Sequence, residues 1–251
     1  MKKFKHSGAL GDLIYSLPIV QHLGGGEFYL HLNQMDWIGQ HYYGALPNPF
    51  HQGRMTTKDY DYMQSFMLAQ PYISAFDTMN PEREITHNLD RFRPSFVGHP
   101  TNYIDLYAQT FNIETTLSDK PWLTAPNPTP TPGRPVVINR TERWIPTTPG
   151  PVWTDLKNQG WEDQSIFVGL RHEYIKFQGD TGWDVPWIET PTMLDLANVI
   201  AGASIFIGNQ SSALALAIGL GVADIRVEAR TDMPRDRNEC YFPQMTNILY
   251  F

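Results

Sequence analysis

The chain has 251 residues, carries a formal net charge of −7, and is 41% hydrophobic and only 18% charged. That length suffices for one large domain or for two small domains of roughly 120 residues each, and the composition is that of a globular protein with a substantial core. The negative charge argues against broad electrostatic binding of nucleic acid, which needs a basic face.

Cysteine, histidine and hydropathy patterns exclude several other classes. The single cysteine, Cys240, cannot form an internal disulfide and suits a reducing compartment. The histidines form no HExxH motif and no Cys/His pairing, so no metal is expected. No apolar stretch of the signal-peptide kind follows the N-terminal lysines, and the longest nearly apolar run, residues 213–223, is far shorter than the ~18–20 residues of a membrane span. We therefore expect a soluble, cytoplasmic protein.

The first half begins with a strand, a loop, a helix and a second strand. A short strand over residues 3–6 precedes a small, polar loop, and apolar residues at helical spacing follow from Leu13 to Val20. Pro18 should kink this helix or limit it to its first turns. The next strand is expected over residues 28–32.

The rest of the first half shows no clear period. Residues 36–117 are rich in Tyr, Phe, Met and Asn, and we expect short helices and loops there. Asp59 and Asp61 superficially resemble a DxD metal motif, but no strand precedes them, so a metal role is disfavoured.

Alternating prolines then divide the chain. Residues 126–135 read PNPTPTPGRP, a pattern that forbids helix and removes the donors that a sheet needs. A stiff linker between two packed units is favoured over a long surface loop within one domain. The predicted domains are residues 1–127 and residues 133–251.

Strands alternate regularly with helices in the second half. This alternation implies a parallel sheet, and Thr192 begins one helix with a capping-box pattern. Buried strands are predicted over residues 136–139, 165–169, 204–208 and 225–228, and helices over residues 153–159, 192–200 and 211–219.

The loop after the first strand holds the first candidate site. Small residues such as Gly8 and Gly11 let a ligand approach the backbone, and the helix N-terminus offers N–H groups to anions or polar oxygens. Asp12 lies at the helix start, where a carboxylate is electrostatically favoured, so it either supports its helix or takes part in chemistry. The spacing is not GxGxxG, which disfavours a dinucleotide-binding enzyme such as a dehydrogenase.

The second candidate site is a polar turn between a strand and a helix. Backbone N–H groups of Gln210, Ser211 and Ser212, together with two hydroxyls, would suit a pair of phosphates. Alternatively, Asn209 and Ser211 only cap the helix.

Two further polar clusters also follow predicted strands. Arg140, Thr141 and Arg143 come after the first strand of the second half, where ligands bind in parallel sheets, and arginine can bind phosphate oxygens bidentately. Gly169 and Glu173 follow the next strand, and Glu173 either holds ribose hydroxyls or forms a loop salt bridge with Arg171. Because all four clusters follow strands, we expect them to gather at one edge of two sheets.

Two of these segments resemble a known family. Residues 11–18 (GDLIYSLP) are similar to the N-terminal signature of heptosyltransferase-like glycosyltransferases of the GT-B fold. Residues 201–212 (AGASIFIGNQSS) are similar to their second signature, in which an Asn-Asp-Ser-Gly turn receives the donor diphosphate. Gln210 and Ser212 replace the family's Asp and Gly. The chain is shorter than typical members and resembles compact phage-type ones.

The resemblance implies an α/β protein of GT-B type, with two Rossmann-like domains facing a cleft. The N-terminal domain would hold the acceptor and the C-terminal domain a nucleotide-sugar donor, which is a substrate rather than a cofactor. Asp12 would be the catalytic base, beside an acceptor-side loop. The acceptor-side residues are Gly8, Leu10 and Gly11; the diphosphate-binding residues are Arg140, Thr141, Arg143, Asn209, Gln210, Ser211 and Ser212; the nucleoside-binding residues are Gly169 and Glu173.

The expected reaction is inverting, metal-independent transfer of a sugar to an acceptor hydroxyl. The acceptor can be a glycan, a small molecule or, as in phage-type members, a modified nucleic-acid base, so modified DNA is among the partners implied. The alternative is a non-catalytic nucleotide-sugar-binding protein on the same fold, which the altered turn favours and the retention of Asp12 disfavours.

Overall fold

The computed structural model describes residues 1–33, 55–96, 102–113, 120–142, 145–146, 149–229 and 247–251. They form two separate sheets, and every strand pair in both is parallel. The first sheet, in the order β3-β2-β1-β4, is made of β1 (Lys2–His6), β2 (Gly26–Leu30), β3 (Ile73–Thr78) and β4 (His87–Asn88). The second, in the order β10-β9-β8-β5-β6-β7, is made of β5 (Val136–Asn139), β6 (Ser165–Val168), β7 (Trp187–Ile188), β8 (Ile205–Gly208), β9 (Asp224–Val227) and β10 (Ile248–Tyr250).

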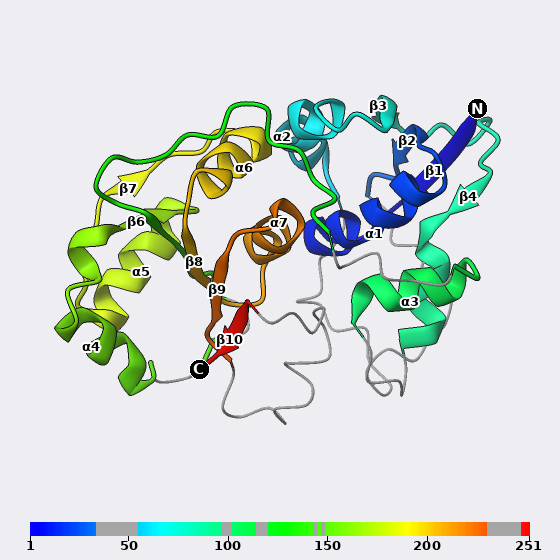
Figure 1. Cartoon of the computed structure of the whole chain (residues 1–251). Helices are drawn as coiled ribbons and strands as arrows, with labels where there is room; N and C mark the ends of the chain where they lie inside the picture. Colours follow the sequence, from blue (N-terminus) through cyan, green and yellow to red (C-terminus); the bar gives the residue numbers. More distant parts are fainter. Residues whose placement is uncertain (34–54, 97–101, 114–119, 143–144, 147–148, 230–246) are drawn as a thin grey trace.

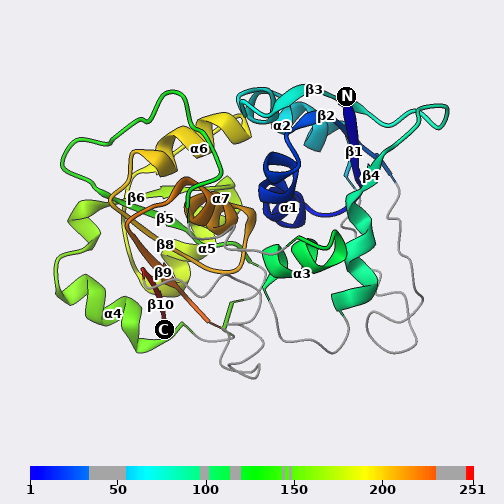
Figure 2. The same cartoon turned by 45° about the vertical axis from the view of Figure 1, so that its right-hand side comes forward.

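Helices cover the sheets and also join the two halves (Figure 1). The helices of the first half are α1 (Leu10–His22), α2 (Thr57–Leu68) and α3 (Tyr103–Thr110), with a 3-10 helix over Leu89–Phe96. Those of the second half are α4 (Pro151–Asn158), α5 (Arg171–Thr181), α6 (Met193–Ala201) and α7 (Ser212–Leu220), with a 3-10 helix over Glu162–Gln164. In Figures 1 and 2 the helices α1 and α7 lie side by side between the two sheets, and α2 lies beside α6.

Alternation along β5 shows how the second sheet is covered on both faces. Val136 and Ile138 pack with α4 and α5 in one hydrophobic cluster, whereas Val137 belongs to the cluster that contains α6 and α7. Successive side chains of a strand point to opposite faces, so a fully apolar strand is what a sheet with helices on both faces requires.

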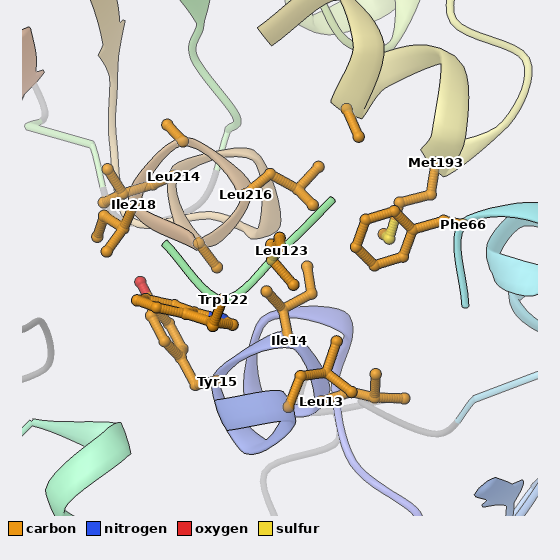
Figure 3. Close-up of a cluster of buried hydrophobic side chains, with 14 of the residues drawn as sticks. Leu13, Ile14, Tyr15, Phe66, Trp122, Leu123, Met193, Leu214, Leu216 and Ile218 are labelled. Carbon is orange, nitrogen blue, oxygen red and sulfur yellow. The ribbon is translucent and has the colours of Figure 1, made fainter. Parts of the chain in front are cut away.

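The larger cluster is one hydrophobic core shared by both halves. Leu13 and Ile14 of α1 lie in it together with Leu214 of α7, and Phe66 of α2 lies beside Met193 of α6 (Figure 3). All five of these side chains are fully buried. The two sheets are therefore joined by packed helices as well as by the connecting chain.

The segment around the predicted linker runs along the second half. The backbone N–H groups of Trp122 and Leu123 both donate to the carbonyl of Gly219 in α7, at 2.9 and 3.0 Å. The N–H of Thr129 donates to the carbonyl of Asn198 in α6 at 2.9 Å. The residues before the proline segment belong to the first sheet and those after it to the second, while the exact domain limits and the cleft stay predictions.

Most expected strands and helices of the second half are confirmed within one or two residues, including the capping box at Thr192. Pro18 does not limit the helix to its first turns, because α1 continues through it to His22. A proline removes one backbone hydrogen bond, and the buried run from Leu13 to Val20 holds the helix regardless.

Two regions that were expected to lack long elements contain regular structure. The middle of the first half includes the 12-residue helix α2, and the residues after β6 form α5 rather than a loop. Of the described residues, none lies in a helix long and apolar enough to cross a membrane.

Candidate functional site

The candidate residues lie near the point in each sheet where the strand order reverses. In the second sheet, β5 lies between β6 and β8, so the chain leaves β5 toward one side and later returns on the other. In the first sheet, β1 likewise lies between β2 and β4. Ligands of open parallel sheets bind outside the carboxyl ends of the strands at such a switch point. The loops after β1, β5 and β8 carry most of the candidate residues, and Gly169 and Glu173 follow the neighbouring strand β6.

The N-termini of α1 and α7 meet between the halves. A Cβ atom built on Gly11 would lie 4.0 Å from both the Cα and the backbone N of Ser212. Asp12, half-buried and in the first turn of α1, is therefore adjacent to the first turn of α7. Residues that are 200 positions apart in the chain, and that carry the two predicted signatures, are neighbours in the fold.

Two tyrosines lie near Asp12. The hydroxyl of Tyr107 donates to the backbone carbonyl of Asp12 at 3.0 Å. Burial raises the pKa of Tyr15, and the nearby Tyr250 and the Asp12 carboxylate raise it further. Tyr15 thus remains a neutral phenol beside Asp12.

The turn before α7 presents backbone donors. Ser211 is the N-cap, and its hydroxyl accepts a hydrogen bond from the N–H of Leu214 at 3.2 Å. In the part of the chain that the structure describes, the N–H groups of Gln210, Ser211 and Ser212 have no hydrogen-bond acceptor. Such groups at a helix N-terminus suit an anion.

Side-chain amides hold this turn against the end of β5. The Oδ1 atom of Asn209 accepts from the N–H of Thr141 at 2.9 Å, and its Nδ2 atom donates to the Thr141 hydroxyl at 3.0 Å. The Ser211 hydroxyl donates to Oδ1 of Asn139 at 3.1 Å, while Nδ2 of Asn139 donates to the carbonyl of Val168 at 2.9 Å. Three strand ends are thereby fixed relative to one another.

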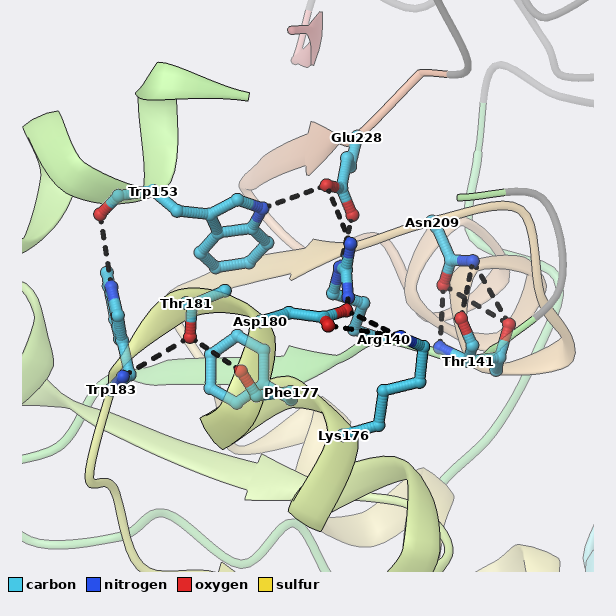
Figure 4. A network of polar contacts seen from close by, with 10 residues as sticks. All are labelled: Arg140, Thr141, Trp153, Lys176, Phe177, Asp180, Thr181, Trp183, Asn209 and Glu228. Carbon is cyan, nitrogen blue, oxygen red and sulfur yellow. Dashed lines mark hydrogen bonds and ion pairs between the residues drawn. The ribbon is translucent and has the colours of Figure 1, made fainter. Parts of the chain in front are cut away.

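Arg140 lies in a network of protein carboxylates (Figure 4). Its Nε and NH2 atoms donate to Glu228 at 2.6 and 3.2 Å, and its NH1 atom donates to Asp180 at 2.6 Å. The indole N–H of Trp153 donates to the same Glu228 at 3.0 Å. Burial opposes the charged form of Arg140, but Glu228 and Asp180 outweigh it and raise the pKa of the guanidinium.

These contacts limit what Arg140 can offer a ligand. Glu228 and Asp180 take three of its five N–H groups, and only 2% of its side chain is exposed to a diphosphate. The second predicted arginine, Arg143, lies outside the described residues. Among the described residues of this cluster, Thr141 and the 209–212 turn are therefore left as the main donor-binding candidates.

Glu173 lies in the first turn of α5 rather than in a loop. Its carboxylate accepts from the N–H of Leu170 at 2.9 Å, and the side chain is 9% exposed. Burial raises the pKa of Glu173, and the bond from Leu170 only partly offsets that effect. A Cβ atom on Gly169 (φ +135°) would lie 2.8 Å from Asn139 Nδ2 and 3.0 Å from the Glu173 carboxylate. Gly169 therefore lets these two polar groups come close together at the end of β6. The predicted salt-bridge partner, Arg171, instead stacks over the rings of Tyr174 and Trp187.

Several residues that shape the site were missed from the sequence. Asn139 was given no role in binding, and Asp180 lies in a helix that was not predicted. Glu228 follows β9, so the rule that polar groups after parallel strands gather at one edge, applied once more, would have found it. No local signal identifies Trp153 as its hydrogen-bond partner.

The predicted absence of a metal stays a prediction. Asp59 accepts the N–H of Thr56 at 2.8 Å as part of the capping box of α2. No group of three or more His, Cys, Asp or Glu side chains among the described residues is arranged to hold a metal ion.

Comparisons with known proteins come from structure alone, because neither a protein-family model nor a curated protein matches the sequence. A family 9 glycosyl transferase from Veillonella parvula aligns with a TM-score of 0.63 and 12% identity over 99% of this chain and 84% of its own. ADP-heptose lps heptosyltransferase II of E. coli aligns with a TM-score of 0.55 and 12% identity over 100% of this chain and 90% of its own.

The iron-containing dodecameric glycosyltransferase TibC of enterotoxigenic E. coli aligns with a TM-score of 0.57 and 14% identity. That alignment covers 98% of this chain and 61% of TibC. A structure of TibC in complex with ADP-D-β-D-heptose aligns with a TM-score of 0.54. At such identities the likeness shows the fold, and the predicted α/β fold of heptosyltransferase-like, GT-B type is thereby confirmed.

Proposed function

We propose that this chain is a glycosyltransferase that moves a sugar from a nucleoside-diphosphate sugar to an acceptor hydroxyl, with inversion and without a metal. The observation that carries the proposal is the approach of Gly11 to Ser212. It supports a site in which Asp12, at the start of α1, faces the N-terminus of α7, whose backbone N–H groups would bind the donor diphosphate. The fold shared with glycosyltransferases of known structure supports it.

The diphosphate of the donor would bind at the N-terminus of α7. As the bond from the anomeric carbon to the diphosphate breaks, negative charge grows on the leaving phosphate oxygens. The N–H groups of Gln210, Ser211 and Ser212 are pre-oriented to stabilise this charge. Asn209 and Thr141 hold the turn in place, and Glu173 and Gly169 would face the nucleoside.

Asp12 would act as the general base. It would accept the proton of the acceptor hydroxyl while that oxygen attacks the anomeric carbon from the side opposite to the diphosphate. This geometry inverts the configuration of the sugar. The acceptor would approach along the loop formed by Gly8, Leu10 and Gly11, and glycans, small molecules and modified DNA are the classes to screen.

Metal independence is a separate part of the proposal. Backbone donors replace the divalent ion in this scheme, so transfer should persist in excess chelator. Loss of activity in chelator that is restored by a divalent ion would contradict it, and TibC, described as iron-containing, makes iron the first ion to add back.

The decisive variant is Asp12→Asn, which keeps the shape of the side chain but cannot take a proton. General-base catalysis contributes roughly 10²–10⁴-fold, so nucleotide release from the cognate donor should fall by that factor, while donor affinity changes little. The matched control is Asp59→Asn, which removes a carboxylate from the first turn of α2 and should leave turnover unchanged.

Two results would overturn the assignment. Turnover of Asp12→Asn within a few-fold of the wild type at saturating substrates would exclude a base role for Asp12. Donor binding without turnover by the wild-type protein, over a full panel of nucleotide sugars and acceptors, would favour a non-catalytic binding protein. The altered residues Gln210 and Ser212 are the reason to consider this alternative.

A further inference from the structure

A chain of hydrogen bonds links the end of β1 to the backbone of Asp12. His6 is fully buried, and its Nδ1 atom accepts from the N–H of Gly8 at 2.9 Å. Its Nε2 atom lies 2.7 Å from the hydroxyl oxygen of Tyr107. That hydroxyl donates to the carbonyl of Asp12 at 3.0 Å. The segment from Gly8 to Asp12 is therefore held at both ends by the same pair of side chains.

The two ends of this chain fix the position of every proton in it. A backbone N–H can only donate, so Nδ1 of His6 carries no proton. A carbonyl can only accept, so Tyr107 gives its single proton to Asp12 and must accept from Nε2 of His6. The three bonds are satisfied together only by a neutral imidazole protonated at Nε2. Neither a second proton on the ring nor the other tautomer can replace it.

We propose that His6 and Tyr107 are positioning residues that hold the Asp12 backbone in register with the N-terminus of α7. This inference rests on the proposed function, in which Asp12 is the base. Neither side chain needs to touch the reacting atoms, because His6 acts on the loop before Asp12 and Tyr107 acts on its carbonyl. A nearby contact supports the same segment: the N–H of Ser7 donates to Asp90 at 3.2 Å.

Packing alone does not call for this polar pair. The ring centroids of Tyr107 and Phe92 lie 4.2 Å apart, and those of His6 and Phe92 lie 6.4 Å apart with the rings stacked. Apolar side chains of similar shape would fill the same space, and replacing both partners of a buried hydrogen bond by apolar groups is often close to neutral. The polar atoms instead act on the two backbone groups that flank the start of α1.

The first test is Tyr107→Phe, which keeps the ring and removes the link between His6 and Asp12. A small displacement of a reacting group costs up to 10²-fold in rate, so kcat should fall roughly ten- to a hundredfold while KM for the donor stays within about twofold. The matched control is Tyr72→Phe, which removes a hydroxyl that donates to the carbonyl of Trp122 at 2.9 Å. It should lower thermal stability comparably and leave kcat unchanged.

Two histidine variants divide the relay. In His6→Asn the side-chain oxygen can still accept from Gly8 but the side chain does not reach Tyr107, and in His6→Gln the reach toward Tyr107 is kept and the acceptor for Gly8 is lost. Each histidine variant should lower kcat. When either is combined with Tyr107→Phe, the fold-loss of kcat should be smaller than the product of the two single fold-losses. If the variants unfold, the protonation state of His6 in the wild-type protein, measured by nitrogen NMR, tests the hydrogen-bond chain.

The second test reads the ring itself and needs no activity. Nitrogen NMR of histidine-labelled protein should show His6 as the neutral tautomer protonated at Nε2 at neutral pH. A ring protonated at Nδ1, or a cationic ring, would overturn the relay. The expected tautomer combined with an unchanged kcat in Tyr107→Phe would overturn the positioning role. A wild-type protein inactive on every donor would instead contradict the proposed function.

Discussion

Arg140 carries a charge at a position where almost no water can reach it. Its side chain and that of Glu228 are both 2% exposed, and Asp180 and the indole of Trp153 complete the set of partners. Removing one partner of a buried ion pair is strongly destabilising, because the remaining charge is then buried without a counter-charge. The geometry therefore suggests that Arg140 joins the ends of β5 and β9 to α5.

Replacement of Arg140 tests this structural role. Arg140→Ala should lower the free energy of unfolding by about 3–5 kcal/mol, because Glu228 stays buried without its cation. Lys176→Ala removes an exposed partner of the same Asp180 and should cost only ~0–1 kcal/mol. Urea unfolding of both variants measures the difference. If both variants lose equally little unfolding free energy and only Arg140→Ala binds the donor more weakly, the role of Arg140 is to bind the diphosphate.

The buried carboxyl of Glu173 should make the stability of the protein depend on pH. Burial raises its pKa above the ordinary value of 4.5, so the folded state disfavours the charged form. The associated stability is present below pH 4.5 and is lost as the pH rises through the raised pKa. Glu173→Gln keeps an oxygen that can accept from Leu170 but does not titrate.

The Glu173→Gln protein should thus be more stable than the wild type at neutral pH, and the difference should vanish toward pH 4. Denaturant unfolding across that range measures it. If Glu173 also holds the ribose hydroxyls, the same variant should bind the donor more weakly. A variant less stable than the wild type at neutral pH would show that the charged cap outweighs burial.

At the scale of elements, α7 is built to let the connecting segment approach it. Gly219 lies within the helix, and a Cβ atom there would come within 2.5 Å of Leu123 Cδ1 and 2.9 Å of Trp122 Cε2. The carbonyl of Gly219 accepts both backbone bonds from that segment. A glycine in a helix interior normally costs roughly 0.5–1 kcal/mol relative to alanine; Gly219 lies one residue before the end of α7, and here the close contact offsets such a cost.

The prediction for Gly219→Ala is therefore the reverse of the usual helix rule. Overpacking of this kind costs typically 1–3 kcal/mol, so the variant should have a lower melting temperature. The matched control is Gly179→Ala in α5, where a Cβ atom meets nothing within 4 Å and stability should rise. An increase in stability for both variants would show that the segment yields to the added methyl group.

At the scale of the whole molecule, the two sheets share one hydrophobic core through α1 and α7. The fully buried Leu214 lies in this core, and the Trp122 and Leu123 side chains of the connecting segment pack into it (Figure 3). A shared core makes separate unfolding of the halves unfavourable, because either half alone would expose its face of α1 or α7 to water.

The expected outcome is one cooperative unfolding transition. Leu214→Ala should cost about 2–5 kcal/mol, and native-state hydrogen exchange should show that loss equally in the amides of β1 and β2 and in those of β5 and β8. A loss confined to β5 and β8 would mean that the halves open independently of each other.

The sequence by itself determined the elements whose pattern is local. The apolar run over β5 was predicted residue for residue, the capping box placed the start of α6, and the turn before α7 was found because strand, polar turn and helix follow one another directly. The same local reasoning allowed for an end of α1 near Pro18 and did not locate α2 or α5, since there long-range packing outweighs a weak or interrupted period.

Only the tertiary structure decided which of these elements meet. The contact of Gly11 with Ser212, the ion pair of Arg140 with Glu228 88 residues away, and the bond from Tyr107 to Asp12 95 residues away depend on strand order and on how α1 packs against α7. A residue type in a sequence shows which interactions a side chain can make. Which partner it has is set by the packing of the whole chain, and at Arg140 that packing selected carboxylates of the protein itself.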